Sequence, residues 1–458
     1  MVPDSRLLSA VESLDYRVTA GDVAAQAGLD VRLAEQELLA LASEANGHLQ
    51  VSEAGDVVYL FPKNVRAILR NASLTLQLKA LWLRIWNVLF YLIRISFGIV
   101  LIASLIIVAI AVFALFIVVV NQRGGTREYN RQRDQRSRDR YQQPYRSGLP
   151  FSLHDLLVLD HYRRRASRWQ AQRRPSEPYS TRDKAASPKM NFLEAVFSFL
   201  FGDGNPNADL GDRRWRLIAS VIRRHDGAVT AEQVAPYLDL PSVDPDNYSG
   251  ELDDHMLPIL QRFKGRPEVS PSGGLIYHFP ALQVMAKNYD TPTVPEYLKE
   301  ESWHFSLASP TQRNWVMLLA IANVSVVIAF ELLFNDSLIS QLTQAGQLIV
   351  GFVEAGYWVF FTYAIAFLLV PALRYLWVRR ANKNVGTRND QRLEWANQLD
   401  QPSSDVQEKL TYAQKFAAET IVSADDLAYT TETDLMTQEL LNAEAIDQDW
   451  RRRLENLL

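Results

Sequence analysis

One apolar run constrains this chain more than any other feature. Residues 97–120, FGIVLIASLIIVAIAVFALFIVVV, contain no charged side chain. The run exceeds the ~20 residues that a helix needs to cross a bilayer, and in lipid a helix satisfies its own backbone polar groups. Residues 314–334 and 347–370 form two further runs of sufficient length. We therefore expect an integral membrane protein with three transmembrane helices, and we expect residues 313–378 to form a hairpin of two of them.

The residues before the first run have a different, amphipathic pattern. On a helical wheel Lys79, Arg84 and Arg94 share one broad arc, and the opposite face is apolar. This pattern predicts a helix in the membrane interface, with Trp82 and Trp86 at headgroup level. A membrane hairpin that turns near residues 96–98 is the alternative, and it puts Arg84 in mid-membrane at a high free-energy cost. Residues 74–120 are thus an amphipathic helix plus a transmembrane helix, or a membrane hairpin, which brings the count to four.

The absence of cysteine narrows the chemistry. The 458 residues carry a net charge of −4 and no cysteine. Disulfides, thiolate nucleophiles and cysteine-ligated zinc or iron–sulfur clusters are therefore excluded for this chain. The N-terminus, MVPDSRLLSAVESL, has no basic region before an apolar one, so we expect no cleaved signal peptide. No Walker loop, Rossmann glycine string or paired-histidine motif occurs, and the expectation is a protein without catalytic residues or a cofactor.

Two stretches of the chain resemble each other. VVYLFP ends at Pro62 and LIYHFP at Pro280, and upstream VTAGDVAAQAGL matches VTAEQVAPYLDL. Each stretch predicts a short helix after a capping threonine, a longer helix (31–45 or 251–263), and two strands around a tight turn. Three helices followed by a β-hairpin resemble a winged helix-turn-helix domain. The resemblance implies a mainly α membrane protein with two α+β winged-helix domains, at residues 1–70 and, after an amphipathic helix, within residues 191–285.

The charge of the third helix bears on what such domains bind. A helix that reads DNA requires Arg or Lys against phosphates and bases. The first copy instead has Glu35, Glu37 and Glu44, and the second has Asp253 and Asp254. Nucleic acid is therefore disfavoured as a partner, and protein contact, including homo-oligomerisation, is favoured.

Arginine marks the flanks of the membrane segments. Residues 123–146 are rich in arginine, and Arg379 and Arg380 follow the last apolar run, whereas residues 335–343 contain no Lys or Arg. The positive-inside rule predicts both Arg-rich flanks on the cytoplasmic or stromal side and residues 335–343 on the other. We expect residues 121–190 to be a largely disordered linker, with an arm for RNA or anionic lipid as the alternative.

Two sets of polar residues are candidate sites. Asp203, Asn205, Asn207 and Asp209 alternate as in a calcium loop, but the glycine and the final glutamate of that loop are missing, which favours a turn between helices. Within or at the ends of the apolar runs lie Asn323, Glu331 and Glu354. Polar residues in a membrane suggest an ion or proton path, although headgroup contact explains the two glutamates equally.

A family resemblance covers most of the chain. NFLEAVFSFLFGDGNPN, RWRLIASVI and RNDQRLEWANQL resemble a poorly characterised family of cyanobacterial and plastid membrane proteins. The resemblance implies a thylakoid, plasma or envelope membrane. Some plant relatives carry an iron–sulfur cluster biosynthesis label, but this chain has no thiolate to hold a cluster.

The tail and the whole chain predict interaction rather than catalysis. Residues 379–458 predict a helical tail, with amphipathic helices at 385–399, 406–422 and 433–457. We expect a membrane-anchored scaffold or assembly factor that contacts lipid and binds proteins through its winged helices. A membrane-bound regulator that touches nucleic acid is the alternative, followed by a component of an ion transporter.

Overall fold

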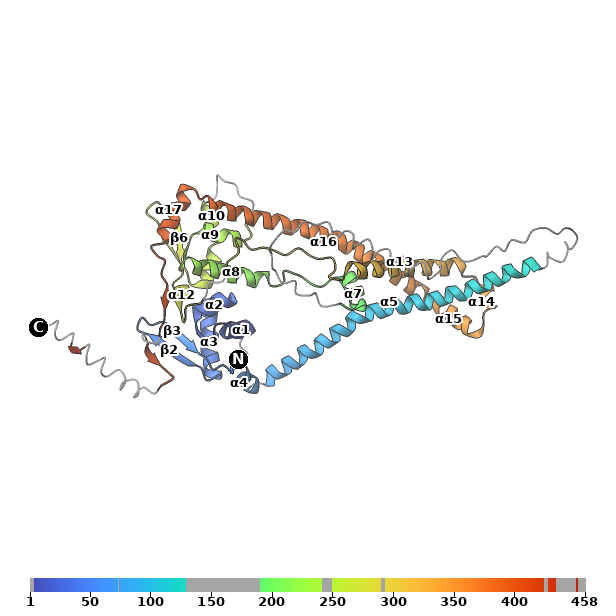
Figure 1. Ribbon diagram of the computed structural model, residues 1–458, viewed down its shortest axis with the longest axis horizontal. Coiled ribbons are helices and arrows are strands. Elements are labelled where there is room, and N and C mark those ends of the chain that lie inside the picture. Colours follow the sequence, from blue (N-terminus) through green and yellow to red (C-terminus); the bar gives the residue numbers. More distant parts are fainter. Residues whose placement is uncertain are drawn as a thin grey trace, which may run out of the picture. The chain divides into compact units, whose positions relative to one another are not determined.

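The structure is a computed structural model that describes residues 4–72, 74–128, 190–240, 249–289, 293–423, 427–433 and 450–451. The chain is mainly helical, with small sheets (Figure 1). It divides into two compact units. Unit 1 holds Met1–Ile93, Phe201–Leu307 and Pro371–Leu458, and unit 2 holds Arg94–Leu200 and Ala308–Val370. The two long helices α5 (Leu74–Glu128) and α16 (Tyr357–Asp400) contribute to both units.

The first part of unit 1, residues 4–72, is here called the N-segment. The Asp4 side chain accepts from the Arg6 N–H at the start of the first helix. Thr19 and Asp22 form a reciprocal capping box at the start of the second, which ends at Gly28 in the left-handed conformation (φ 69°). The elements are α1 (Ser5–Ser13), β1 (Arg17–Thr19), α2 (Ala20–Ala27), α3 (Val31–Glu44), β2 (His48–Ser52), β3 (Val57–Leu60) and α4 (Val65–Ala72).

The second part, residues 210–289, is the M-segment and has a similar order of elements. Its third helix differs from the sequence prediction, because residues 251–263 are divided between two helices. Pro258 has no N–H to donate to the Asp254 carbonyl, which disfavours one continuous helix, and the chain instead starts a new helix with Pro258 in its first turn. The elements are α8 (Leu210–Arg224), β4 (Ala228–Val229), α9 (Ala231–Val234), the 3₁₀ helix η1 (Ala235–Tyr237), α10 (Ser249–Asp254), α11 (Leu257–Phe263), β5 (Arg266–Val269), β6 (Leu275–His278), α12 (Pro280–Gln283) and β7 (Val284–Met285).

The two similar sequence endings form equivalent strands. In the N-segment β3 lies between β1 and β2, and in the M-segment β6 lies between β4 and β5, with all pairs antiparallel. Tyr59 pairs with Val18, and Tyr277 pairs with Val229. The aromatic residues of both endings are buried, as their alternation predicts: Tyr59, Phe61, Tyr277 and Phe279.

The part of unit 1 after α16, here called the C-segment (residues 401–433), corrects the prediction of a wholly helical tail. The expected helix at 406–422 ends early, since α17 covers only Ser404–Ala413. Strand β8 (Thr420–Ile421) pairs in parallel with β7, and β9 (Leu427–Thr430) pairs antiparallel with β2. The β-branched residues of the sequence TIV were the local signal for a strand. Residues 385–399 continue α16, and residues 434–449 and 452–457 of the third expected helix lie outside the described residues.

The C-segment also buries the outer faces of the two hairpins. Val58 (0% exposed) packs against Val422 and Ala286. Ile276 (0% exposed) packs against Ala413. The two hairpins are therefore covered on both faces, and residues distant in the sequence cover the second face.

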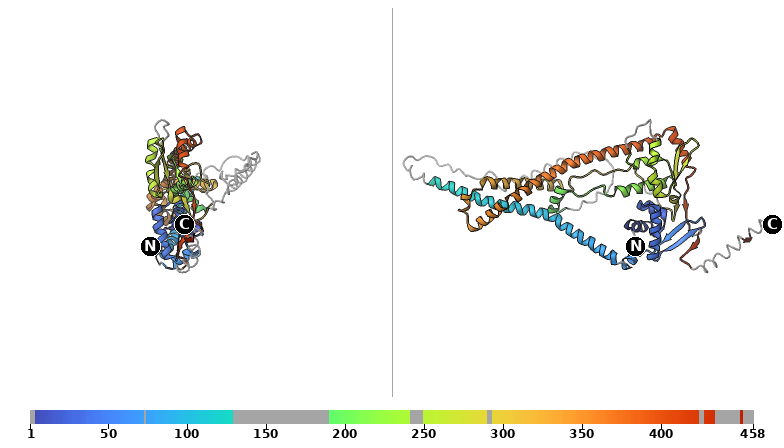
Figure 2. Two further views of the ribbon diagram at one scale, coloured as in Figure 1. Left: turned by 90° about the vertical axis from the view of Figure 1, so that its left-hand side faces the viewer. Right: turned by 180° about the vertical axis from the view of Figure 1, so that it is seen from behind.

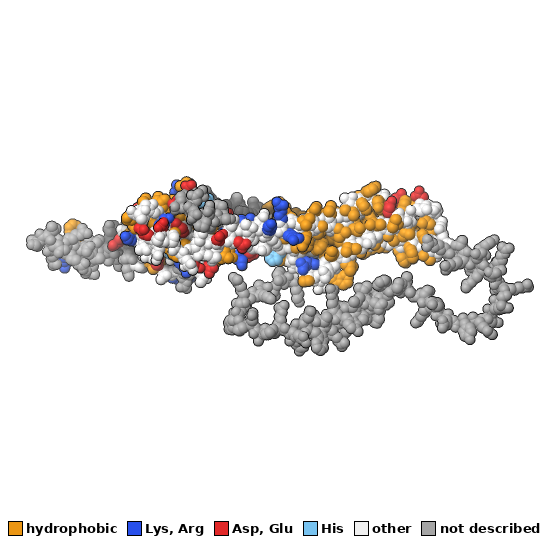
Figure 3. All heavy atoms as spheres, turned by 90° about the horizontal axis from the view of Figure 1, so that it is seen from above, with side chains coloured by type: hydrophobic (Ala, Val, Ile, Leu, Met, Phe, Trp, Pro, Cys, Tyr) orange, Lys and Arg blue, Asp and Glu red, His pale blue; other side chains and the backbone are white. Residues whose placement is uncertain are grey.

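Unit 2 is a helical bundle. Besides its parts of the two long helices it contains α7 (Phe192–Phe201), α13 (Pro310–Leu333), α14 (Asp336–Ile339) and α15 (Gln344–Ala355). Three of the described helices are long and apolar enough to cross a membrane, in Arg84–Gln122, Pro310–Leu333 and Tyr357–Asp400. Their surface carries many exposed hydrophobic side chains (Figure 3).

The first of these helices settles the hairpin alternative. Helix α5 is continuous from Leu74 to Glu128, so the chain makes no turn near residues 96–98, and the amphipathic stretch runs directly into the apolar one. A single glycine costs a helix only about 1 kcal/mol. Gly98 instead allows close packing, since a Cβ there would lie 2.7 Å from the Cδ2 of Leu193 on α7. The third expected span, residues 347–370, is interrupted at Gly356, which separates α15 from α16.

The directions of the helices contradict the predicted arrangement of flanks. Leu101 packs near Val316, and Val108 packs in the cluster that contains Val327, so α5 and α13 run in the same direction. Gln122 Nε2 donates to Gln341 Oε1 at 2.9 Å. The start of the Arg-rich flank therefore lies beside residues 335–343, not at the opposite end of the bundle as the arginine distribution predicted.

Candidate functional site: the joint and the strap of unit 1

The N- and M-segments share one hydrophobic core, and we call their contact the joint. Buried residues from both segments form a single cluster, to which Trp395 of α16 also belongs. Helix α2 packs against α8 and α12. A Cβ on Gly21 would lie 1.9 Å from the carbonyl oxygen of Ala281. Gly21 therefore permits a backbone approach that no larger residue allows.

A buried carboxylate connects three elements at the joint. The Asp22 side chain is fully buried and closes the capping box by accepting from the Thr19 N–H at 2.9 Å. It also accepts from Arg223 Nη2 on α8 at 2.6 Å and from the Ala286 N–H at 3.0 Å. A buried charge without partners would cost several kcal/mol, so these three donors make Asp22 a residue that fixes the joint.

Arg17 adds a second polar connection at the joint. Its guanidinium donates to the carbonyls of Ala286 and Val422, the latter at 3.0 Å. The Tyr289 hydroxyl donates to the Arg17 carbonyl at 2.7 Å, and burial raises the pKa of this hydroxyl. The C-segment is thereby attached to both other segments.

A cavity of 1010 Å³ opens beside the joint. Its lining includes Gln26 of the N-segment, Arg224 of the M-segment and Glu419 of the C-segment. Glu296, which follows the M-segment in the sequence, also lines it. Charges of both signs line it, and among the described residues no group of three or more His, Cys, Asp or Glu side chains is placed to hold a metal.

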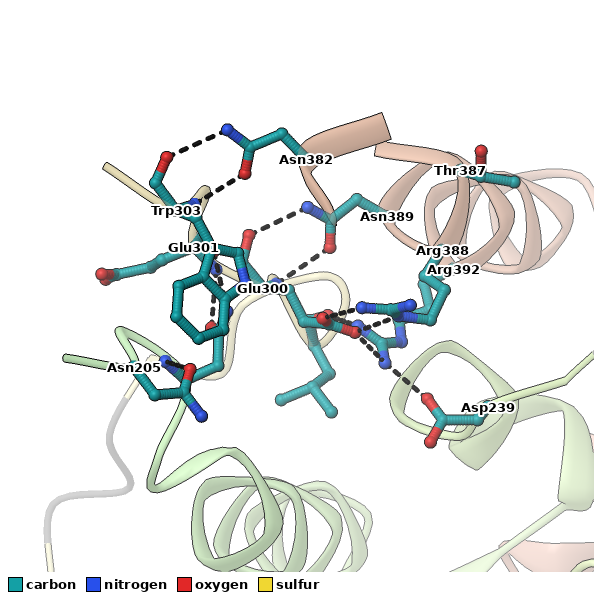
Figure 4. Close-up of polar contacts among 12 residues, drawn as sticks. Asn205, Asp239, Glu300, Glu301, Trp303, Asn382, Thr387, Arg388, Asn389 and Arg392 are labelled. Atoms are coloured by element: carbon teal, nitrogen blue, oxygen red, sulfur yellow. Dashed lines mark hydrogen bonds and ion pairs between the residues drawn. The ribbon is translucent and has the colours of Figure 1, made fainter. Parts of the chain in front are cut away.

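A second polar site lies where α16 meets residues 298–305, here called the strap (Figure 4). Asn389 Nδ2 donates to the Glu300 carbonyl at 2.9 Å, and its Oδ1 accepts from the Glu300 N–H at 2.8 Å. Asn382 holds Trp303 in the same way, at 2.9 and 2.7 Å. Seven helical residues rise about 10 Å, which matches about three residues of extended chain. The asparagine spacing on α16 therefore fits the strap.

An ion-pair network holds the same strap. The buried Glu300 carboxylate accepts from Arg388 at 2.8 and 2.5 Å and from Arg392 at 2.8 Å. Arg392 also pairs with Asp239 at 2.5 Å, and Asp239 with Arg214 at 2.5 Å. Burial alone would raise the pKa of Glu300 and of Asp239, but the arginines outweigh it and hold both pKa values below their ordinary range.

The four residues of the candidate calcium loop contact the strap, the loop itself or a neighbouring arginine. Asn207 makes a two-way amide pair with the Glu301 backbone, at 2.7 and 2.8 Å. Asp203 accepts from the Leu307 N–H at 2.8 Å, and Asn205 accepts from the Asn207 N–H at 3.0 Å. Asp209 lies 3.9 Å from Arg216. The alternating oxygens thus bind backbone amides and an arginine, so the turn between helices is the reading that the contacts favour.

The three polar residues of the apolar runs are not brought together. Asn323 is buried on α13, where its Nδ2 lies 3.5 Å from Ser104 Oγ of α5 and its Oδ1 has no hydrogen-bond partner. Glu331 and Glu354 are exposed near the ends of α13 and α15. Of the three candidate residues for an ion path, only Asn323 is buried among the described residues.

The predicted interfacial residues all lie on α5. Trp82 and Trp86 are exposed, at 64% and 52%, and Arg84 is exposed as well. Arg94 is half-buried, with its guanidinium carbon 5.8 Å from the ring centre of Phe197 on α7. The side chain of Lys79 lies outside the described residues.

The sequence reasoning missed the strap itself. The sequence feature that could have indicated it is RNDQRLEWANQL, in which residues at helical spacing place polar and aromatic side chains on one face of a helix. These residues are Arg388, Asn389, Arg392 and Trp395. The matching carboxylate, Glu300, lies about 90 residues earlier in the chain, at a position with no motif of its own.

Comparison with known proteins finds one relative to report. The chain is similar to the uncharacterized chloroplastic protein At5g03900 of Arabidopsis thaliana, with 33% identity over 470 residues that cover 99% of this chain and 82% of the plant protein. No protein-family model matches the chain. No solved structure matches it. The name of the plant protein assigns no activity and mentions no iron–sulfur chemistry, so only the plastid part of the predicted resemblance is confirmed.

Proposed function

The chain belongs to the family of this chloroplastic Arabidopsis protein, and we propose that it is a membrane-anchored scaffold or assembly factor. In this proposal the soluble unit binds other proteins and performs no catalysis. The membrane anchor consists of the three long apolar helices, and the setting is a thylakoid, plasma or envelope membrane.

We infer that the N- and M-segments are duplicated winged-helix domains. Support comes from the order of elements and from the strand register, in which Tyr59 and Tyr277 occupy equivalent positions. Equivalent bonds also extend the pairing of β3 with β1 and of β6 with β4, from the Phe61 N–H to the Tyr16 carbonyl at 2.8 Å and from the Phe279 N–H to the Gly227 carbonyl at 2.7 Å. Two similar domains that share one core cannot move independently, and together they present a broad surface to a partner. Such a surface suits a scaffold.

The contacts and the exposed side chains of α3 support the proposal that the partner is a protein. A winged helix that reads DNA presents this helix to the major groove. Here Glu35 on α3 pairs with Lys264, at the end of α11, at 2.7 Å, so a cation of the M-segment is already neutralised by the N-segment. The exposed side of α3 also carries Leu33 (42%) and Leu39 (55%), which suit an apolar protein contact better than a polyanion.

The soluble parts are proposed to lie on one side of the membrane, which, if α5, α13 and α16 each cross once, requires one further crossing between Glu128 and Pro310. The three segments are held together by shared cores and by the contacts of Asp22 and Arg17, which only parts in one compartment can make. We propose that this side is the stroma or cytoplasm. The strap then attaches the other segments of unit 1 to the part of α16 that belongs to this unit.

Site-specific photo-crosslinking in native membranes tests the proposal. A photoreactive residue in place of Leu39 is expected to give a discrete protein adduct, whereas the same residue in place of Ser9, exposed on α1, gives none. In parallel, the full chain in detergent is titrated with duplex DNA at several salt concentrations. Salt-sensitive DNA binding below micromolar, with no protein adduct at Leu39, would replace the scaffold by the nucleic-acid regulator.

A further inference from the structure

The last strand of the chain covers one edge of the N-segment sheet. The strand order is β1-β3-β2-β9, so β9 adds to β2, with Gln50 opposite Thr430 and Val51 opposite Tyr429. Leu49 marks the end of this pairing. Its N–H donates to Thr431 Oγ1 at 2.8 Å, and its carbonyl accepts from the Thr431 N–H at 2.9 Å.

Few side chains hold β9 in place. Leu427 packs against the small cluster around Val58, whereas Ala428 and Tyr429 are exposed. The strand is therefore held mainly by backbone hydrogen bonds, which any chain of the same sequence can make equally well. Exchange of one β9 for another preserves all of these bonds.

The equivalent edge of the M-segment is closed to such pairing. Leu49 and Pro267 are equivalent, since they pair with Tyr59 and Tyr277 respectively. Pro267 has no N–H, and proline on an edge strand prevents further strand addition. Strand β5 has no partner beyond β6 among the described residues. Only the N-segment edge thus accepts an added strand.

We propose that β2 of one copy of this chain accepts β9 of a second copy, so that the protein associates by exchange of its last strand. The copies are inserted in one membrane with the same orientation, which places their soluble units in one layer at a high local concentration. Exchange of an identical element is a low-cost route to a dimer because the native contacts are kept. This inference is independent of which protein the scaffold binds.

The absence of native cysteine makes the exchange directly measurable. Gln50 and Thr430 do not exchange backbone hydrogen bonds, and such facing pairs have the Cα separation that a disulfide requires. Chains with Gln50→Cys and chains with Thr430→Cys are co-expressed, and membranes are oxidised with copper–phenanthroline. Strand exchange predicts a covalent dimer that contains one chain of each kind.

Two controls distinguish disulfides formed by strand exchange from disulfides formed by random collision of two chains. Chains with Gln50→Cys alone are expected to give at least tenfold less dimer. Adding Thr431→Pro to the Thr430→Cys chain removes the N–H that Leu49 accepts, and dimer yield is expected to fall by a similar factor. Because Thr431 lies outside the hydrophobic clusters, this change leaves the rest of the unit folded.

The results that overturn the proposal are equally definite. A chain with both Gln50→Cys and Thr430→Cys that closes only within itself, while the mixed single variants give no dimer, shows that β9 stays on its own β2. A mixed dimer that is insensitive to Thr431→Pro shows collision and not strand pairing. No disulfide in any variant shows that β9 does not occupy this edge.

Discussion

Truncation of one core aromatic in the M-segment is predicted to weaken the N-segment as well. Phe279 is fully buried, and its ring centre lies 6.5 Å from that of Phe263 in an edge-to-face arrangement. Removal of a buried Phe side chain costs about 3–5 kcal/mol through lost burial and the cavity that remains. At 1.4 kcal/mol per factor of ten, Phe279→Ala raises the open population of the unit roughly 100- to 4,000-fold.

The shared core decides where that effect is observed. Hydrogen exchange of the full chain in lipid nanodiscs measures the protection of each amide, and protected core amides exchange through cooperative opening. Since both segments belong to one cluster, the amides of β3, around Tyr59, are expected to lose as much protection as those of β6. Leu307→Ala, at a side chain that is 60% exposed, is the matched control and should change neither. Loss of protection confined to the M-segment would refute the single core and restore two independent domains.

Three further predictions concern the joint, the strap and the membrane. Gly21→Ala is expected to separate α2 from α12, because the added Cβ meets a backbone carbonyl at 1.9 Å, and to lower the melting temperature of the full chain in detergent. Glu300→Gln is expected to destabilise the strap at neutral pH by less than the ~3–5 kcal/mol of a fully broken buried pair, because the buried Arg392 keeps its pair with Asp239 and Arg388 is partly exposed. The lowered pKa of Glu300 means that the wild-type strap loses this stability as the pH falls below the ordinary value of 4.5, whereas the variant, followed by hydrogen exchange of the strap, shows a smaller loss that comes from Asp239. Cysteines introduced at Gln122 and Ser337 should be labelled by a membrane-impermeant reagent from one side and a cysteine at Ser9 from the other; labelling of all three from one side would refute α5 as a transmembrane helix.

Local sequence patterns were sufficient for the elements that depend on local physics. The capping threonines and the pairs of strands around tight turns predicted α2, β3 and β6 close to their observed positions, because capping and strand formation depend on residues close in the sequence. The apolar runs at 97–120 and 314–334 likewise predicted helices, because lipid leaves the backbone no alternative.

The errors share one physical cause, which is contact between distant parts of the chain. The helix expected at 406–422 was replaced by a strand because β7, more than a hundred residues earlier, offers backbone partners to Thr420 and Ile421. The arginine count put the two basic flanks together, but α5 and α13 run in the same direction, which no local pattern encodes.

Differences between the two similar segments follow from what each one has to contact. Proline at position 267 closes the edge of β5, and the outer face of that hairpin is covered by α17 through Ala413. Leucine at position 49 leaves the edge of β2 open, and only a strand, β9, covers it. A side chain that packs on a helix and a backbone that pairs with a strand differ in specificity, since the first requires complementary shape and the second only an extended chain. The M-segment is therefore the fixed half of the soluble unit, attached to α16 by the strap, and the N-segment is the half that remains able to bind a chain in exchange for its own.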